Sequence, residues 1–235
     1  MAKRALILGL DTAAGAYLAR LLGARGYRVG GTGGSDLIDR LGTAADTVPQ
    51  GDRVQAAALA DEVYDLREPT GDCAGLLTAT GAARIFIPVG ADDGAQMTMV
   101  EAARTRGRFV ATARIGAHES RLGPGTSPLA RIVAAASVGA AASPADLASV
   151  IDCGWTPDFV EAIARLLAAS AGIDDVIVTG QTIAGTDAAR IAAGWFRGER
   201  LPANKAKGAP NASGWRAAAV GGEVVEILCE GIAVA

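Results

Sequence analysis

The segment from residue 9 to residue 15 has the glycine spacing of a turn that binds phosphate. Gly9 ends a short apolar run that predicts a strand, and Gly15 falls inside the helix predicted over 12–24. Glycines serve such a turn where the chain bends sharply, where the backbone approaches a diphosphate, and where the helix packs on the strand. The amides and the dipole at the helix N-terminus attract the phosphates. The predicted nucleotide-binding residues of this turn are Gly9, Leu10, Thr12, Ala13 and Gly15.

Several neighbouring polar residues admit both a binding role and a structural one. Thr12 stands where a middle glycine would leave room for a diphosphate, and such turns also occur without any ligand. Asp52 follows the predicted third strand, where its carboxylate can accept a hydrogen bond from adenine or belong to a turn. Asp36 can bind a ribose hydroxyl or cap a helix. Asp92 and Asp93 can form an acid/base pair or remain solvated. We expect Asp52 to join the cofactor site.

The composition and charge favour a soluble protein over a nucleic-acid-binding or membrane protein. The chain has 235 residues, of which 50% are hydrophobic and 20% charged, enough to bury one substantial core. The formal net charge is −3 and no run of Lys or Arg occurs, so no nucleic acid is expected as a partner. No apolar run approaches a membrane span, and the first strand begins too early to leave room for a signal peptide. We therefore expect a cytoplasmic protein that has no contact with a membrane.

Cysteine and histidine are too sparse to predict a metal centre. Cys73, Cys153 and Cys229 are far apart and form no CxxC pair, and His118 is the only histidine. Structural metal sites need several thiolate or imidazole ligands at close spacing. The sequence thus predicts no metal and three reduced, buried thiols, which fits a cytoplasmic location.

Residues 1–116 alternate between strand-like and helix-like segments, which predicts a Rossmann-type α/β fold with a doubly wound parallel sheet. Continuous apolar runs are typical of strands buried on both faces of such a sheet, and right-handed crossovers connect them. The predicted strands are 5–9, 26–30, 47–48, 61–66, 84–89 and 108–114. The predicted helices are 12–24, 35–41, 54–60, 72–82 and 95–106.

Residues 117–235 are more helical and predict a small cap on the substrate side of the sheet. A strand near 175–179 is expected to return to the main sheet. No linker or internal repeat separates the halves, so we expect 1–235 to form a single extended domain. The predicted helices here are 128–136, 145–151, 157–169, 187–197 and 223–230.

Collinear segments of the chain resemble the GDP-mannose 4,6-dehydratases, which are extended short-chain dehydrogenase/reductases of the NAD-dependent epimerase/dehydratase group. Residues 3–19 followed by 26–30 resemble the opening of that family. His118-Glu-Ser120 resembles its NHESPRRG segment, and Arg131-Ile132 stands where the family has Lys-Ile. The further matching segments are 61–66, 152–162, 174–180, 204–207 and 214–216. The matches run along essentially the whole chain, which is shorter than a full family member.

The resemblance implies a cofactor, a substrate class and an assembly. It implies NADP or NAD as the cofactor, and a nucleotide sugar as the substrate. The residues at the positions that would contact the sugar nucleotide are His118, Glu119, Ser120 and Arg131. It also implies a homo-oligomer, or a hetero-oligomer with an active homologue.

The chain departs from the family where the chemistry is done. The family uses a Tyr-x-x-x-Lys pair in which the lysine lowers the pKa of the tyrosine so that it can act as a base. None of the three tyrosines has a lysine four residues on. Residues 88–94 replace a hydroxyl-bearing stretch of the family. Gly33 and Gly34 replace the arginines that follow its second strand. Arg67 and Glu68 replace the small residues that follow its fourth strand.

These departures predict a degenerate homologue, a pseudoenzyme, that binds a dinucleotide or nucleotide sugar without the usual Tyr/Lys chemistry. Two alternatives stay open. The chain can be an active dehydratase or reductase with a non-standard catalytic base, or a scaffold that has lost its ligand. No catalytic residue can be assigned from the sequence.

Overall fold

The computed structural model describes most of the chain. The described residues are 1–67, 73–78, 84–90, 94–122, 125–169, 176–178, 180–199 and 221–234. Glu68, Asp92, Asp93 and the matching segments 204–207 and 214–216 lie outside them.

The chain divides into two compact units. The first unit comprises Met1–Ile115 and Val160–Ile177, and the second comprises Gly116–Phe159 and Val178–Ala235. The expected halves were 1–116 and 117–235, whereas the first unit ends at Ile115 and also includes Val160–Ile177. That the two form a single extended domain stays a prediction.

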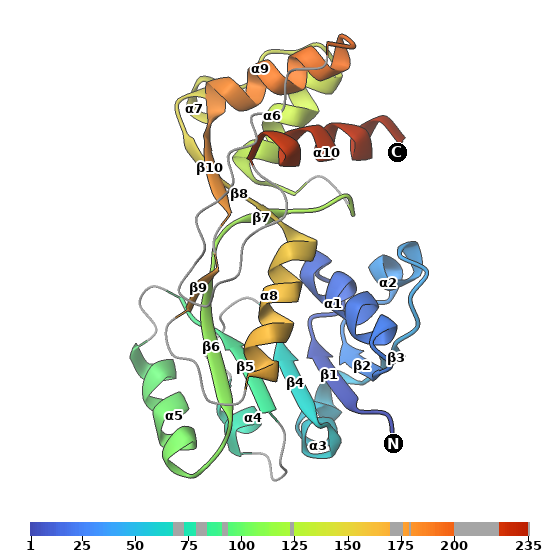
Figure 1. The fold of residues 1–235 in the computed structure, drawn as a ribbon, viewed down its shortest axis with the longest axis vertical. Helices are drawn as coiled ribbons and strands as arrows, with labels where there is room; N and C mark the ends of the chain where they lie inside the picture. Colours follow the sequence, from blue (N-terminus) through green and yellow to red (C-terminus); the bar gives the residue numbers. More distant parts are fainter. Residues whose placement is uncertain are drawn as a thin grey trace. The chain divides into compact units, whose positions relative to one another are not determined.

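A parallel sheet forms the centre of the first unit and confirms the predicted Rossmann-type fold (Figure 1). Its order is β3-β2-β1-β4-β5-β6-β9, and the pairs from β3 through to β6 are all parallel. The order places β1 between β2 and β4, as a doubly wound sheet requires. The strands are β1 (Arg4–Leu8), β2 (Arg28–Thr32), β3 (Asp46–Thr47), β4 (Glu62–Asp65), β5 (Arg84–Pro88), β6 (Val110–Ile115) and β9 (Val176–Val178).

Helices cover both faces of this sheet. On one face, α3, α4 and α5 enclose an apolar core with alternate strand residues such as Leu6, Leu8 and Val63. On the other, α1 and α8 lie side by side in Figure 1, joined by an ion pair between Arg25 and Glu161. The elements are α1 (Ala13–Ala24), α2 (Asp36–Arg40), η1 (Gln50–Asp52), α3 (Arg53–Leu59), α4 (Ala74–Thr78), α5 (Gly94–Thr105) and α8 (Thr156–Ala168).

The buried carboxylate of Glu62 accepts hydrogen bonds from residues at or near the amino ends of β1, β2 and β4 in the first unit. Glu62 is 3% exposed and opens β4. It accepts hydrogen bonds from Lys3 Nζ at 3.1 Å, from the Tyr27 hydroxyl at 3.1 Å and from the Tyr64 hydroxyl at 2.7 Å. Lys3, Tyr27 and Glu62 precede or open their strands, so the cluster lies at the edge of the sheet opposite the glycine turn.

The second unit contains helices and a small sheet of order β10-β8-β7. The helices of this unit were expected, but β7, β8 and β10 were not. The helix predicted over 145–151 is wrong at its end, because residues 150–151 open β8. The elements are β7 (His118–Glu119), α6 (Pro128–Ser137), α7 (Pro144–Leu147), β8 (Val150–Trp155), β10 (Gln181–Ala184), α9 (Gly185–Phe196) and α10 (Gly221–Val234).

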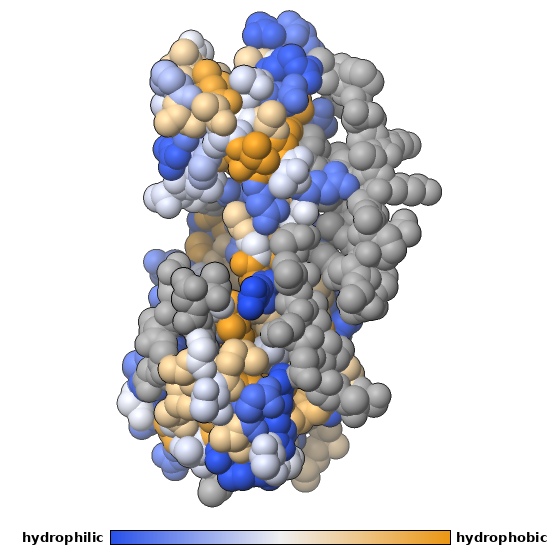
Figure 2. Space-filling view, turned by 90° about the vertical axis from the view of Figure 1, so that its left-hand side faces the viewer, coloured by the Kyte–Doolittle hydropathy of each residue, from blue (hydrophilic) through white to orange (hydrophobic). Residues whose placement is uncertain are grey.

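Hydrophilic residues separate small hydrophobic groups on the described part of the surface drawn in Figure 2. The large hydrophobic side chains that are exposed within the described residues are Met1, Val54, Leu59, Val138 and Val150. Of these, Val54 and Leu59 lie on α3, and the others lie apart in the sequence. This distribution singles out no partner surface, so the predicted oligomer stays a prediction.

Candidate functional site

The glycine turn lies at the carboxyl edge of the sheet, beside the ends of β2 and β4. Leu8 at the end of β1 pairs with Thr32 of β2 and with Asp65 of β4. The Thr32 carbonyl then accepts hydrogen bonds from the amides of Gly9 at 3.1 Å and Leu10 at 2.8 Å. Ligands of open α/β sheets bind at this edge.

Both predicted glycines are required by the backbone geometry. Gly9 has a φ of 97°, which disfavours a side chain, and a Cβ there would lie 3.3 Å from the carbonyl of Leu66. A Cβ on Gly15 would meet the carbonyl oxygen of Gly9 and lie 2.8 Å from its carbonyl carbon. The turn is therefore a close approach of helix to strand, which is one of the roles that glycines have in dinucleotide-binding turns.

Thr12 caps α1 instead of pointing its hydroxyl at a ligand. Its Oγ1 accepts a hydrogen bond from the Gly15 amide at 2.9 Å and donates to the Gly9 carbonyl at 2.8 Å. This satisfies one of the amides of the first helical turn. The amides of Ala13 and Ala14 have no acceptor within the helix, as for every helix start. Thr12 thus occupies the position of a glycine, and the amides of Ala13 and Ala14 stay available at the carboxyl edge of the sheet.

Carboxylates stand at the end of β2. Gly33 follows that strand with a φ of 114°, and a Cβ there would lie 2.8 Å from Cγ of Asp11. Asp11 and Asp36 are exposed. Asp36 opens α2, which has no side-chain hydrogen bond from its N-cap residue, Ser35. Asp52 is exposed at the end of η1, and its amide donates to the Pro49 carbonyl at 2.9 Å, so the structure places it in a turn.

Arg67 turns back onto the end of β4. Its Nε and Nη2 donate to the two oxygens of Asp65 at 2.8 and 2.7 Å. The side chains are 19% and 9% exposed, so this is a largely buried pair. Arg67 was expected only as a departure from the small residues of the family, and its pairing with Asp65 was not expected. The signal was available, because an acidic and a basic residue two apart at a strand end can meet.

A further polar side chain lies near the end of β5. Gln96, on α5, is 6% exposed and donates from Nε2 to the Pro88 carbonyl at 3.2 Å. Its Oε1 is buried and has no hydrogen-bond partner among the described residues. A buried acceptor without a partner is unusual. Nothing in the sequence marks this residue, since Gln96 lies in an ordinary helical pattern.

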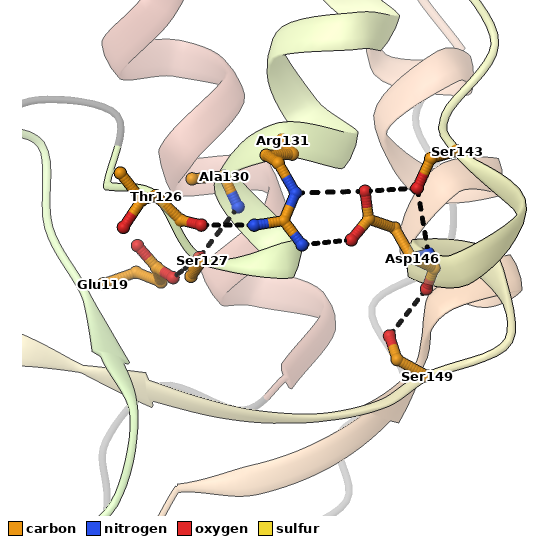
Figure 3. A network of polar contacts seen from close by, with 8 residues as sticks. All are labelled: Glu119, Thr126, Ser127, Ala130, Arg131, Ser143, Asp146 and Ser149. Carbon is orange, nitrogen blue, oxygen red and sulfur yellow. Dashed lines mark hydrogen bonds and ion pairs between the residues drawn. The ribbon is translucent and has the colours of Figure 1, made fainter.

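In the second unit, Glu119 and Arg131 belong to a network of polar contacts (Figure 3). Glu119 is buried and accepts a hydrogen bond from the hydroxyl of Ser127, the N-cap residue of α6. Burial raises the pKa of Glu119. Arg131 donates to both oxygens of Asp146 and to the carbonyl of Thr126. The hydrogen bond from Arg131 lowers the pKa of Asp146. Arg131 therefore joins α6 to α7.

His118 and Ser120 flank Glu119 but make separate contacts. The His118 ring packs edge-on against Phe159, with 4.9 Å between the ring centres. Burial lowers the pKa of His118, which keeps the imidazole neutral at pH 7. Ser120 Oγ accepts a hydrogen bond from the Leu122 amide at 3.2 Å. The four predicted sugar-nucleotide residues thus lie in one unit, and each makes internal contacts.

The described residues provide no metal ligands and no membrane segment. No group of three or more His, Cys, Asp or Glu side chains within the described ranges could hold a metal ion. In the same part of the chain no helix is both long and apolar enough to cross a bilayer. All three cysteines are buried, and they form no disulfide with one another.

No family model and no curated protein sequence matches the chain, but solved structures do. The dTDP-glucose 4,6-dehydratase of Bacillus anthracis, in complex with NAD, has a TM-score of 0.76 at 10% identity, covering 99% of this chain and 97% of that one. The UDP-glucuronic acid 4-epimerase of Bacillus cereus, also in complex with NAD, has a TM-score of 0.76 at 12% identity, and the match covers 98% of this chain and 99% of that one. The enzyme WbmF of Bordetella bronchiseptica, in complex with NAD+ and UDP, has a TM-score of 0.73 at 12% identity, and the match covers 99% of this chain and 92% of that one.

The chain has the fold of these enzymes. At identities this low the likeness establishes the fold alone. The neighbours are nucleotide-sugar dehydratases and epimerases of the NAD-dependent epimerase/dehydratase group, which is the broader group expected from the resemblance.

Proposed function

We propose that this chain binds NAD or NADP at the glycine turn and is a degenerate homologue of nucleotide-sugar dehydratases of the GDP-mannose type. The observation that carries the proposal is the close packing of the glycine turn: a Cβ on Gly15 would overlap the carbonyl of Gly9, and a Cβ on Gly9 would lie 3.3 Å from the carbonyl of Leu66. Glycines at these positions permit the close packing of helix on strand that accompanies diphosphate binding in dinucleotide-binding folds. The solved structures that share the fold include complexes with NAD and with UDP.

The residues present fit a dinucleotide. Gly9 and Gly15 let the backbone approach a diphosphate, and the amides of Ala13 and Ala14 at the start of α1 can donate to its oxygens. Thr12 Oγ1 keeps the first helical turn in place. A bound nicotinamide cofactor supplies hydride transfer.

The chain lacks the groups that would use this cofactor in the way the family does. No Tyr-x-x-x-Lys pair occurs in the sequence, so the family's arrangement, in which a lysine four residues on lowers the pKa of the tyrosine, is missing. Of the tyrosines, Tyr27 and Tyr64 have raised pKa values, chiefly because they are buried. They hydrogen-bond Glu62 at the opposite edge of the sheet. The proposal is therefore binding without dehydration of the sugar.

In the second unit we propose that His118, Glu119, Ser120 and Arg131 form the nucleotide-sugar side. Arg131 can exchange its bidentate contact with Asp146 for a phosphate, because a guanidinium binds both groups in the same geometry. We further propose a cytoplasmic location and an oligomer, either of this chain or with an active homologue.

Calorimetric titration of the full chain with NAD, NADP and GDP-mannose tests the proposal. Ala13→Glu places a carboxylate at the start of α1, where it repels a diphosphate yet favours the helix dipole. We expect it to abolish dinucleotide binding while the fold is retained. The matched control is Ala24→Glu, at the exposed far end of the same helix, which should bind as the wild type does.

The outcomes separate the three hypotheses. Binding that Ala13→Glu removes supports the proposal. If none of the three ligands binds, the chain is a scaffold and the proposal fails. Incubation with GDP-mannose and NADP, followed by detection of a 4-keto-6-deoxy sugar, would instead show an active enzyme with a different base.

A further inference from the structure

The end of β2 carries a carboxylate that does not come from β2. Dinucleotide-binding folds place a side chain about 20 residues after the glycine turn, at the end of the second strand, to contact the adenosine ribose. Here that place is Gly33, which has no side chain. The carboxylate of Asp11, from the glycine turn itself, stands against it.

The backbone holds Asp11 in this place. The amides of Gly9 and Leu10 both donate to the Thr32 carbonyl, which fastens the turn to the last residue of β2. Asp11 is the next residue of the turn, and Gly33 is the next residue after Thr32. A Cβ on Gly33 would lie 2.8 Å from Cγ of Asp11 and 2.9 Å from its amide nitrogen. The Asp11 carboxylate therefore fills the space that a side chain at 33 would need.

The charges around this place are suited to hydroxyl groups and not to a phosphate. Asp11 is exposed, and the structure shows no ion pair between its carboxylate and any described residue. Gly33 and Gly34, the first two residues after β2, provide no cation. A carboxylate accepts hydrogen bonds from the 2′- and 3′-hydroxyls of a ribose. A negatively charged 2′-phosphate would be repelled.

We infer that Asp11 selects the unphosphorylated dinucleotide, so that the chain binds NAD in preference to NADP. This rests on the proposed function, since it requires that a dinucleotide occupies the glycine turn. It differs from the resemblance, which implies NADP or NAD without choosing. Asp11 is a specificity-determining residue supplied by the turn, and Gly33 is the glycine that makes room for it.

Titration of the full chain with NAD and with NADP, at one ionic strength, tests the inference. We expect the wild type to bind NAD about tenfold more tightly than NADP or better, because like charges meet within a few ångströms in the second complex. Asp11→Asn removes the charge and keeps the size. It should narrow the NAD-to-NADP ratio severalfold, mainly by tightening NADP.

Asp36→Asn is the control, since Asp36 is an exposed carboxylate three residues beyond Gly33, at the start of α2. It should leave the ratio unchanged. Equal affinities of the wild type for the two dinucleotides, or a ratio that Asp36→Asn shifts and Asp11→Asn does not, would overturn the inference. If the wild type binds neither dinucleotide, the proposed function itself fails. Circular dichroism of each variant checks that the fold persists.

Discussion

Thr12 has two effects on the glycine turn that oppose each other. As a side chain in the place of a glycine it narrows the path of a diphosphate. As the N-cap residue of α1 it accepts a hydrogen bond from the Gly15 amide, which has no acceptor within the helix. In the structure the hydroxyl makes the capping hydrogen bond. The residue thus stabilises the turn whether or not a ligand is present.

Removal of the Thr12 hydroxyl should therefore weaken the fold. We expect Thr12→Ala to lower the free energy of unfolding by about 1 kcal/mol, because the capping hydrogen bond is lost. Thr12→Ser keeps the hydroxyl and should stay within about 0.5 kcal/mol of the wild type. Urea denaturation followed by circular dichroism measures both. A Thr12→Ser variant as unstable as Thr12→Ala would show that the methyl group, and not the cap, matters.

At the scale of elements, α1 is defined by how closely its first turn approaches β1. Gly15 packs against the backbone of Gly9 and Leu10, with no space for a methyl group. Gly23, near the other end of the same helix, is exposed, and a methyl group added there would have nothing within 4 Å. One helix therefore holds a glycine that packing requires and another that packing does not.

Alanine at these two positions should act in opposite directions. Gly15→Ala forces α1 away from β1, and we expect it to cost about 2–3 kcal/mol of stability, as overpacking does. Gly23→Ala should stabilise the chain by about 0.5–1 kcal/mol, because alanine is the better helix former. Chemical denaturation of the two variants side by side is the measurement. Similar stabilities for both would contradict the close approach.

At the scale of the whole molecule, the stability of the chain should fall in alkaline solution because of the cluster around Glu62. The pKa of Lys3 is raised by its hydrogen bond to Glu62, and the pKa values of Tyr27 and Tyr64 are raised chiefly by burial. A group whose folded-state pKa is raised contributes stability that is complete below its unfolded-state pKa. That contribution is lost as the pH rises from about 10, the ordinary pKa of tyrosine, through the folded-state values.

Replacement of both tyrosines by phenylalanine tests this pH dependence. The double variant Tyr27→Phe with Tyr64→Phe should be less stable than the wild type at pH 7, because buried Glu62 loses two donors. Between about pH 9 and 11 its free energy of unfolding should fall less steeply than that of the wild type. Denaturation curves collected across this range provide the slopes. Parallel slopes would mean that other groups govern the alkaline loss.

Much of the first unit could be predicted because its signals are local. β1 and β5 lie within short, largely apolar runs, and glycines or polar residues separate strands from helices, so the alternation is visible along the chain. The boundaries shift by a residue or two, as for β2, predicted at 26–30 and observed as Arg28–Thr32. In the second unit, β7 and β10 are too short to show a pattern, and β8 mixes polar with apolar residues. Such strands form because a partner pairs with them.

The sequence by itself determined the Rossmann-type fold and the place of the glycine turn, since both follow from the order of residues within short segments. Only the tertiary structure decided where the side chains of the turn go. It directed the Thr12 hydroxyl into its own helix and set Asp11 against Gly33, which is far away along the chain. It also closed Arg67 on Asp65 and Arg131 on Asp146. Contacts of this kind depend on which strands and helices become neighbours, and that information belongs to the packed sheet.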